Sequence, residues 1–217
     1  MISKLANGTW VVMFTSGYNN VSAPSVAGDG IGYLYVLNAF TGKIINKITT
    51  GVGDAGTPSG LAQINNFVDN GSINNTTARV YGGDLLGNVW RFDVNGNLPP
   101  SGVEAALIGT AKTSSGAAQP ITVRPELAEL NGRPMVFVAT GRLLGATDVT
   151  DLQTQSIYGI VDPLAGNPAY TNLRAALKPL GLTVQGSGPT AYRTVACTGV
   201  TAAQCSAANG WVVDLPD

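Results

Sequence analysis

One short pattern occurs three times along the chain: a turn or strand end, a strand that contains an aromatic residue, and a closing Asp or Asn. The copies are Gly32–Asn38 (GYLYVLN), Gly87–Asp93 (GNVWRFD) and Gln155–Asp162 (QSIYGIVD). Short β-branched and aromatic runs bounded by Gly, Asn and Asp predict strands joined by tight turns. Repeated four-strand units are typical of a β-propeller, in which each sheet packs face to face on its neighbours. We therefore predict an all-β chain, with a generic β-sandwich as the alternative.

The length of the chain limits how much of a propeller it can form. Only about three such units fit within 217 residues, fewer than the roughly four to eight blades of a closed ring. The last segment, Asn209–Asp217, is interpreted as the opening strand of a further unit. We expect residues 1–217 to form a single partial propeller domain of a larger protein. Open sheet edges and an exposed apolar blade face would favour self-association.

Helix content is expected to be low. Residues 163–190 are predicted to be a loop insertion, and within it Tyr170–Lys178 is the one segment with helical character. Thr171 or Asn172 would be its N-cap, and Pro179 follows its end. We expect a surface loop with a short helix here.

The composition excludes several classes of function. The chain has no histidine, which excludes Ser–His and Cys–His nucleophiles and the commonest transition-metal ligand. Its 12 Lys+Arg against 13 Asp+Glu, a net charge of −1, provide no basic field for nucleic acid. No apolar run approaches the roughly 18 residues of a membrane helix. The hydrophobic share of 44% predicts a folded, globular chain.

The only two cysteines, Cys197 and Cys205, lie in a stretch rich in Thr, Ala and Gly. Two cysteines that close a small loop are typical of a disulfide in an exocytoplasmic protein, and two unrelated free thiols are the alternative. The N-terminal residues contain no apolar segment of the kind found in signal peptides. An exported protein would therefore have to carry its export signal outside this segment.

A segment of 14 residues, Val80–Asp93 (VYGGDLLGNVWRFD), strongly resembles the hallmark of the C-terminal propeller of the PilC/PilY proteins of bacterial type IV pili. Shorter pieces agree with this family in the same order, and the resemblance extends from Trp10 to Leu215. These pieces are Gly17–Asn20, Gly32–Gly42, Gln119–Thr122, Thr140–Leu144 ahead of Asp148, and Gly210–Leu215.

The resemblance implies a modified version of the quinoprotein-dehydrogenase propeller, without catalysis. It implies an exported protein at the pilus tip, at the cell surface or in the periplasm of a Gram-negative bacterium. Relatives support pilus assembly by opposing retraction, which links them to twitching motility, and they mediate attachment to host cells and surfaces. The implied partners are minor pilins or other pilus components, and host-cell or surface ligands.

Relatives of this family often hold calcium in a loop just before the hallmark, and the matching loop here is Asp69–Ala78. Calcium prefers several oxygen ligands, with affinity rising with the number of carboxylates. The candidate ligands are Asp69, Asn70, Ser72 and Asn74, of which only Asp69 is an acid and it lies out of register. We expect a polar hairpin loop without bound calcium, and a calcium-binding regulatory module is the alternative.

A quinone-dependent enzyme is another alternative, because propellers of this ancestry can hold pyrroloquinoline quinone. The chain has no adjacent cysteine pair and too few blades to enclose a funnel, so we expect no cofactor and no enzyme. We interpret the three tryptophans, Trp10, Trp90 and Trp211, as residues that pack blades together.

Several charged residues are predicted to have local roles. Asp84 and Asp93 should cap the backbone N–H groups of turns. Arg91 should be solvated or pair with a loop, and Arg142 should pair with Asp148 or Asp151. The expected contact surfaces are the loops at residues 18–30, 54–58, 95–102 and 197–205.

Overall fold

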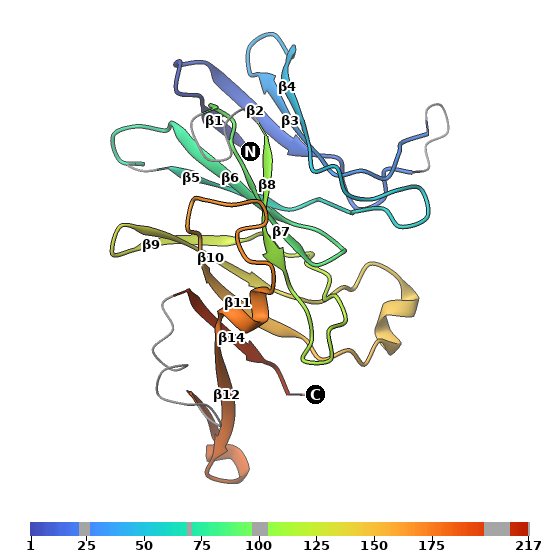
Figure 1. The fold of residues 1–217 in the computed structure, drawn as a ribbon, viewed down its shortest axis with the longest axis vertical. Coiled ribbons are helices and arrows are strands. Elements are labelled where there is room, and N and C mark those ends of the chain that lie inside the picture. Colours follow the sequence, from blue (N-terminus) through green and yellow to red (C-terminus); the bar gives the residue numbers. More distant parts are fainter. Residues whose placement is uncertain (22–26, 69–70, 97–103, 198–208, 217) are drawn as a thin grey trace.

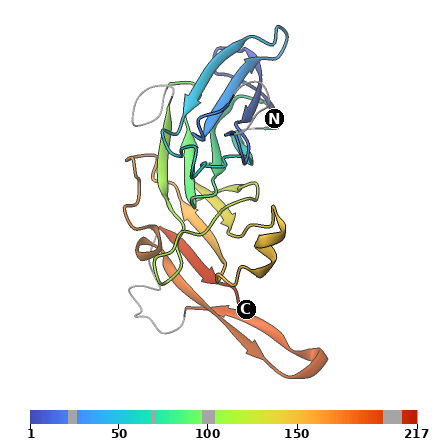
Figure 2. The same cartoon turned by 90° about the vertical axis from the view of Figure 1, so that its right-hand side faces the viewer.

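The computed structural model describes residues 1–21, 27–68, 71–96, 104–197 and 209–216. Three sheets follow one another along the chain and along the long axis of the molecule (Figure 1). A view turned by 90° shows the same succession, with a hairpin projecting from the last sheet (Figure 2). The prediction of an all-β chain built from about three repeated units is confirmed.

The first two sheets are four-stranded antiparallel meanders in which neighbours in sequence are neighbours in space. The strands of the first sheet are β1 (Ile2–Lys4), β2 (Trp10–Thr15), β3 (Tyr33–Asn38) and β4 (Ile44–Thr49). Those of the second sheet are β5 (Ile64–Val68), β6 (Thr77–Gly83), β7 (Asn88–Phe92) and β8 (Ala105–Thr110).

The third sheet has six strands in the order β13-β12-β14-β11-β10-β9. Its strands are β9 (Glu126–Leu130), β10 (Arg133–Ala139), β11 (Ser156–Val161), β12 (Lys178–Gln185), β13 (Tyr192–Ala196) and β14 (Gly210–Asp214). β14 pairs antiparallel with β11, so it is the fourth strand of this unit. The interpretation of Asn209–Asp217 as the start of a further unit is wrong, because the long insertion after β11 separates β14 in sequence from the sheet that it completes.

Residues 163–190 contain more regular structure than the predicted loop. The helix α1 (Leu173–Ala176) is a single turn, and Asn172 is its N-cap, accepting a hydrogen bond from the backbone N–H of Ala175. β12 then begins at Lys178, pairs in parallel with β14 and continues into the hairpin with β13. A short 3₁₀ helix, Gly188–Thr190, lies in the turn of that hairpin. The alternation of Leu180, Leu182 and Val184 with smaller or polar residues is the strand signal that the prediction of a loop missed.

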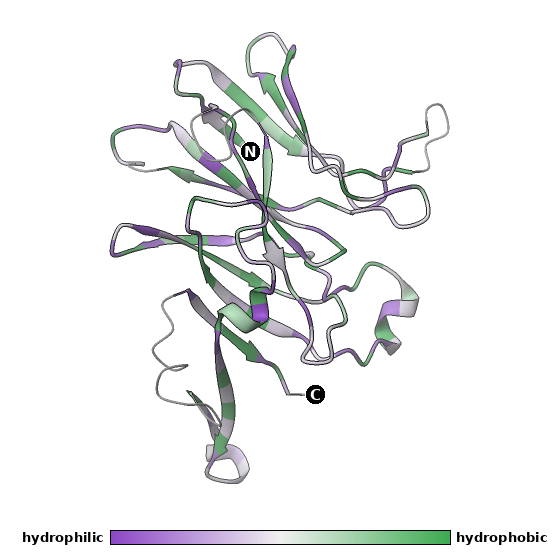
Figure 3. Ribbon diagram, in the orientation of Figure 1, coloured by the Kyte–Doolittle hydropathy of each residue, from purple (hydrophilic) through white to green (hydrophobic). Residues whose placement is uncertain are grey.

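Two apolar cores lie between the sheets. Val11, Met13, Leu34 and Val36 of the first sheet pack in one cluster with Val80, Trp90 and Phe92 of the second. Tyr81, Val89 and Ile108 of the second sheet pack in the other cluster with Val136, Val138, Tyr158 and Ile160 of the third. Figure 3 shows the corresponding bands of hydrophobic residues along the strands. Because side chains alternate between the two faces of a strand, β6 and β7 each contribute side chains to both cores. These two strands are almost completely buried.

The described part of the chain contains no helix that is both long enough and apolar enough to cross a membrane.

Candidate functional site

The turn between β6 and β7 is organised by the carboxylate of Asp84, which is fully buried. The carboxylate accepts hydrogen bonds from the backbone N–H groups of Leu86 (2.9 Å) and Asn88 (2.8 Å). It also accepts from the side chains of Asn88 (3.0 Å) and Trp90 (2.8 Å). Burial raises the pKa of Asp84, and these four donors oppose that rise. Asp84 therefore holds the turn together, as predicted.

Asp93 has the corresponding role at the other end of β7. Its carboxylate accepts hydrogen bonds from the backbone N–H groups of Asn95 (2.8 Å) and Gly96 (2.7 Å). The two acids thus lie at opposite ends of one strand, and each binds the backbone of its own turn. This arrangement confirms the prediction that they are capping residues.

Arg91 forms a buried ion pair with Asp162, with 2.6 Å between Nη1 and Oδ1. The exposed fractions of the two side chains are 1% and 0%. Tyr81 donates a hydrogen bond of 2.8 Å from its hydroxyl to the other oxygen of Asp162. Burial, followed by the charge of Asp162, raises the pKa of Tyr81. Of the two predicted roles of Arg91, solvation is wrong, because the third sheet covers the face of β7 that does not pack on the first. Pairing with a loop is confirmed, because Asp162 lies in the loop that directly follows β11.

A second polar network joins α1 to the third sheet. Arg174 pairs with Asp214 of β14 and donates hydrogen bonds to Ser156 of β11 (3.1 Å) and to the backbone oxygen of Lys112 (2.7 Å). Burial alone would raise the pKa of Asp214, but the hydrogen bonds from Arg174 and Ser156 outweigh it and the pKa is lowered. This network fixes α1 against β11 and β14, two inner strands of the third sheet.

The acids of the hallmark, and the acid that pairs with its arginine, are all engaged by structural partners. Asp84 and Asp93 bind the backbone of their own turns, and Asp162 binds Arg91 and Tyr81. Within the described ranges, no cluster of three or more His, Cys, Asp or Glu side chains could hold a metal ion.

The predicted calcium loop is only partly described. Asp69 and Asn70 lie outside the described residues, and Ser72 is exposed in a turn. The side-chain oxygen of Asn74 accepts hydrogen bonds from the backbone N–H (3.1 Å) and the hydroxyl (2.6 Å) of Thr76. That oxygen is therefore already engaged in a local turn, and the absence of bound calcium stays a prediction.

The disulfide prediction concerns the segment after β13. Cys197 is disulfide-bonded, and Cys205 lies outside the described residues. Their pairing stays a prediction.

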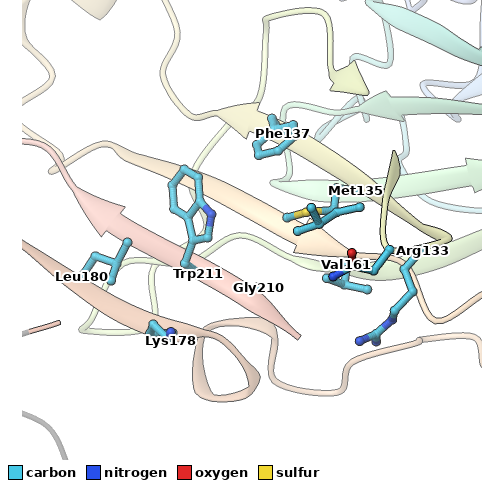
Figure 4. Close-up of a pocket in the computed structure, with 10 residues that line it drawn as sticks. Arg133, Met135, Phe137, Val161, Lys178, Leu180, Gly210 and Trp211 are labelled. Atoms are coloured by element: carbon cyan, nitrogen blue, oxygen red, sulfur yellow. The ribbon is translucent and has the colours of Figure 1, made fainter. Parts of the chain in front are cut away.

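An apolar groove of about 580 Å³ lies on the face of the third sheet that points away from the second (Figure 4). Met135 and Phe137 of β10 and Trp211 of β14 line it, with a distance of 6.2 Å between the ring centroids of Phe137 and Trp211. The indole of Trp211 lies directly over Gly159, where a β-carbon would be 2.6 Å from the ring. Among the residues that line the groove, only Arg133 and Lys178 are charged.

The first sheet also has an aromatic outer face. Phe14 and Tyr35 stack with 5.3 Å between ring centroids, and the ammonium group of Lys47 lies 3.8 Å from the centre of the Tyr33 ring. Both terminal sheets therefore expose an apolar face that packs on no other sheet of the described chain.

The three tryptophans were predicted to pack blades together. Trp90 packs between sheets as predicted, whereas Trp10 is partly exposed and Trp211 lines the groove.

The loop between β10 and β11, residues 140–155, is a feature that the predicted contact surfaces missed. Arg142 pairs with Asp148 (2.8 Å), one of the two predicted partners. The motif Thr140–Leu144 ahead of Asp148 was a sequence signal for an ordered loop at this place.

Comparison with known proteins places these features in context. The family model described as PilY1 beta-propeller domain matches residues 1–180. The chain is 33% identical over 175 residues to a type IV pilus biogenesis factor PilY1 homolog of Xylella fastidiosa, covering 80% of this chain and 13% of that protein. It is 29% identical over 184 residues to type IV pilus biogenesis factor PilY1 of Pseudomonas aeruginosa, covering 74% of this chain and 15% of the relative.

The crystal structure of the Pseudomonas aeruginosa PilY1 C-terminal domain has the same fold. It matches with a TM-score of 0.72 and 24% identity, covering 100% of this chain and 49% of that one. The chain thus spans about half of the matched crystal structure and a much smaller part of the curated relatives.

Proposed function

The chain belongs to the PilY1 β-propeller domain family, and from this membership we propose that it is part of a type IV pilus biogenesis factor. The observation that carries the proposal is the family match over residues 1–180, which includes the Asp84 turn and the Arg91–Asp162 ion pair. The chain would support pilus assembly through contacts with other proteins and would catalyse no reaction.

The geometry of the charged residues supports a non-catalytic role. The acids and the arginine of the hallmark are buried and occupied by structural partners, as a scaffold requires. A catalytic acid or base needs a free position beside a bound substrate. Exposed apolar surfaces, by contrast, are suited to protein contacts.

The proposal includes a larger assembly and a location. We propose that the chain is a segment of a longer propeller, whose further sheets cover the groove at Trp211 and the aromatic face at Phe14. In isolation the same faces would favour self-association. The proposed partners are minor pilins or other pilus components, and surface or host-cell ligands for attachment. The proposed location is the pilus tip, the cell surface or the periplasm.

The experiment is deletion of the gene in the bacterium that encodes the chain, followed by electron microscopy of surface pili. The proposal predicts a large loss of pili that is reversed when the full-length gene is supplied in trans. An unchanged number of pili in the deletion strain would contradict it.

A further inference from the structure

The loop between β10 and β11, residues 140–155, carries an unusual concentration of exposed aliphatic side chains. The exposed fractions are 74% for Leu143, 73% for Val149 and 92% for Leu152, and Leu144 is also exposed. The loop projects from the body of the molecule, as the yellow-gold segment of Figures 1 and 2 shows. Single exposed apolar residues are common on protein surfaces, but several on one short loop indicate a contact surface.

The loop is held in place by hydrogen bonds rather than by burial of these side chains. The carboxylate of Asp148 accepts from Arg142 Nε (2.8 Å) and from the backbone N–H groups of Leu144 (2.8 Å) and Gly145 (3.1 Å). A 3₁₀ helix, Ala146–Thr150, forms the tip. The aliphatic side chains are therefore presented on a braced loop, which lowers the entropy cost of binding a partner.

The base of the loop is closed as well. The hydroxyl of Thr140 donates to the side-chain oxygen of Gln155 (2.8 Å) and accepts from the backbone N–H of Ser156 (2.8 Å). Beside the loop is a hollow of about 500 Å³, lined by Leu152, Leu215 and Pro216 among others. A partner that covers Leu152 would also reach this hollow.

The charges near the loop indicate which kind of surface it fits. Arg142 is paired with Asp148, and the carboxylate of Asp151 accepts from the backbone N–H of Gln153 (2.9 Å). Association with an anionic membrane depends on Lys and Arg side chains that face the lipid next to apolar residues. The only cation of this loop is neutralised by its own acid, which favours a protein surface over a lipid one.

We propose that the β10–β11 loop docks an uncharged, apolar surface of another protein, with Leu143, Val149 and Leu152 as the anchoring side chains. The identification of that partner as a component of the pilus machinery rests on the proposed function.

The test uses the full-length protein in the bacterium that encodes it, with the photo-crosslinking amino acid p-benzoylphenylalanine at position 152. The same amino acid at position 40 is the matched control, because Phe40 is 85% exposed in the turn between β3 and β4. The proposal predicts one adduct with another protein of the pilus fraction from position 152 and none from position 40. It also predicts that Val149→Asp lowers the yield of that adduct about tenfold, because a buried aliphatic contact is lost, whereas Phe40→Asp leaves it unchanged.

Three results would overturn the proposal. The first is no adduct from position 152, and the second is an adduct within the same chain, which would show that the loop is covered by its own protein. The third is sedimentation of the purified full-length protein with vesicles of phosphatidylethanolamine and phosphatidylglycerol that Leu152→Asp abolishes, which would show a membrane contact instead.

The outcome is separable from the proposed function. Loss of pili in the gene deletion without a specific adduct at position 152 would contradict the docking loop alone. A normal number of pili in the deletion strain would contradict the role in pilus biogenesis, whatever the loop binds.

Discussion

Arg91 and Asp162 form an ion pair of 2.6 Å that joins two sheets, although they lie 71 positions apart in the sequence. Arg91 is on β7 of the second sheet, and Asp162 directly follows β11 of the third. With Tyr81 on the same carboxylate, the pair acts as a polar clamp between the second and third sheets. The segment that resembles the family hallmark, Val80–Asp93, thus contributes Tyr81 and Arg91 to the contact that holds these two sheets together.

Removal of one partner of this clamp should destabilise the fold strongly. Asp162→Ala leaves the guanidinium of Arg91 buried without this carboxylate, so the free energy of unfolding should fall by about 3–5 kcal/mol. Urea unfolding followed by circular dichroism measures it. The control is Glu126→Gln, which breaks the exposed pair with Arg124 and should cost less than about 0.5 kcal/mol. Equal effects of the two variants would show that the clamp contributes little.

The contact of Trp211 with Gly159 predicts a steric effect. A β-carbon at position 159 would be 2.6 Å from the indole ring, so Gly159→Ala should displace the ring. We expect a loss of about 1–3 kcal/mol in the free energy of unfolding, together with a change in tryptophan fluorescence. Gly145→Ala is the control, because no atom lies within 4 Å of a β-carbon there. Unchanged stability and fluorescence in Gly159→Ala would contradict the packing described for the groove.

The brace at Asp148 predicts a local pH dependence. Hydrogen bonds from the backbone of Leu144, together with those from Arg142 and Gly145, hold the pKa of Asp148 below its usual value. The folded loop therefore gains stability from the carboxylate above the unfolded pKa of about 4, and loses it as the pH falls through the lower, folded value. Hydrogen exchange should show protection of the amides of Leu144 and Gly145 that disappears in this acidic window. In Asp148→Asn, protection should be weak at every pH, and a profile like that of the wild type would contradict the brace.

The predicted pairing of Cys197 with Cys205 has a simple chemical test. The native chain should show no free thiol before reduction and two after it, and peptide mapping should recover the two cysteines in one linked species. Closing a loop of this size stabilises by roughly 2–3 kcal/mol in the chain-entropy description, so reduction should lower the melting temperature. Two reactive thiols in the unreduced protein would contradict the pairing.

The sequence predicted the features that depend on local patterns. The short strands, the Gly turns and the capping roles of Asp84 and Asp93 follow from spacing within a few residues. For the N-cap at Asn172 and for the partner of Arg142, the sequence left two neighbouring candidates, and one of the two was correct in each case. Both contacts join residues that are close in the sequence, which is why they could be predicted.

The features that the sequence did not predict depend on contacts between distant segments. Arg91 looks like the exposed position of an alternating strand until the third sheet covers that face. β14 looks like the start of a new unit because residues 162–209 separate it from β11. The aliphatic residues of the β10–β11 loop could be buried or exposed as far as the sequence shows, and only the structure reveals that they are exposed.

The central proposal is that the polar groups buried between the second and third sheets, Tyr81, Arg91 and Asp162, build a scaffold and perform no chemistry. Its most direct test is the full-length protein with Tyr81→Phe, Arg91→Met and Asp162→Leu, which replaces the clamp by apolar groups of similar size. Surface pili are counted by electron microscopy in a strain that carries only this variant, at a verified wild-type protein level. The account predicts a wild-type number of pili. A variant that folds and reaches its wild-type level but supports no pili would contradict it.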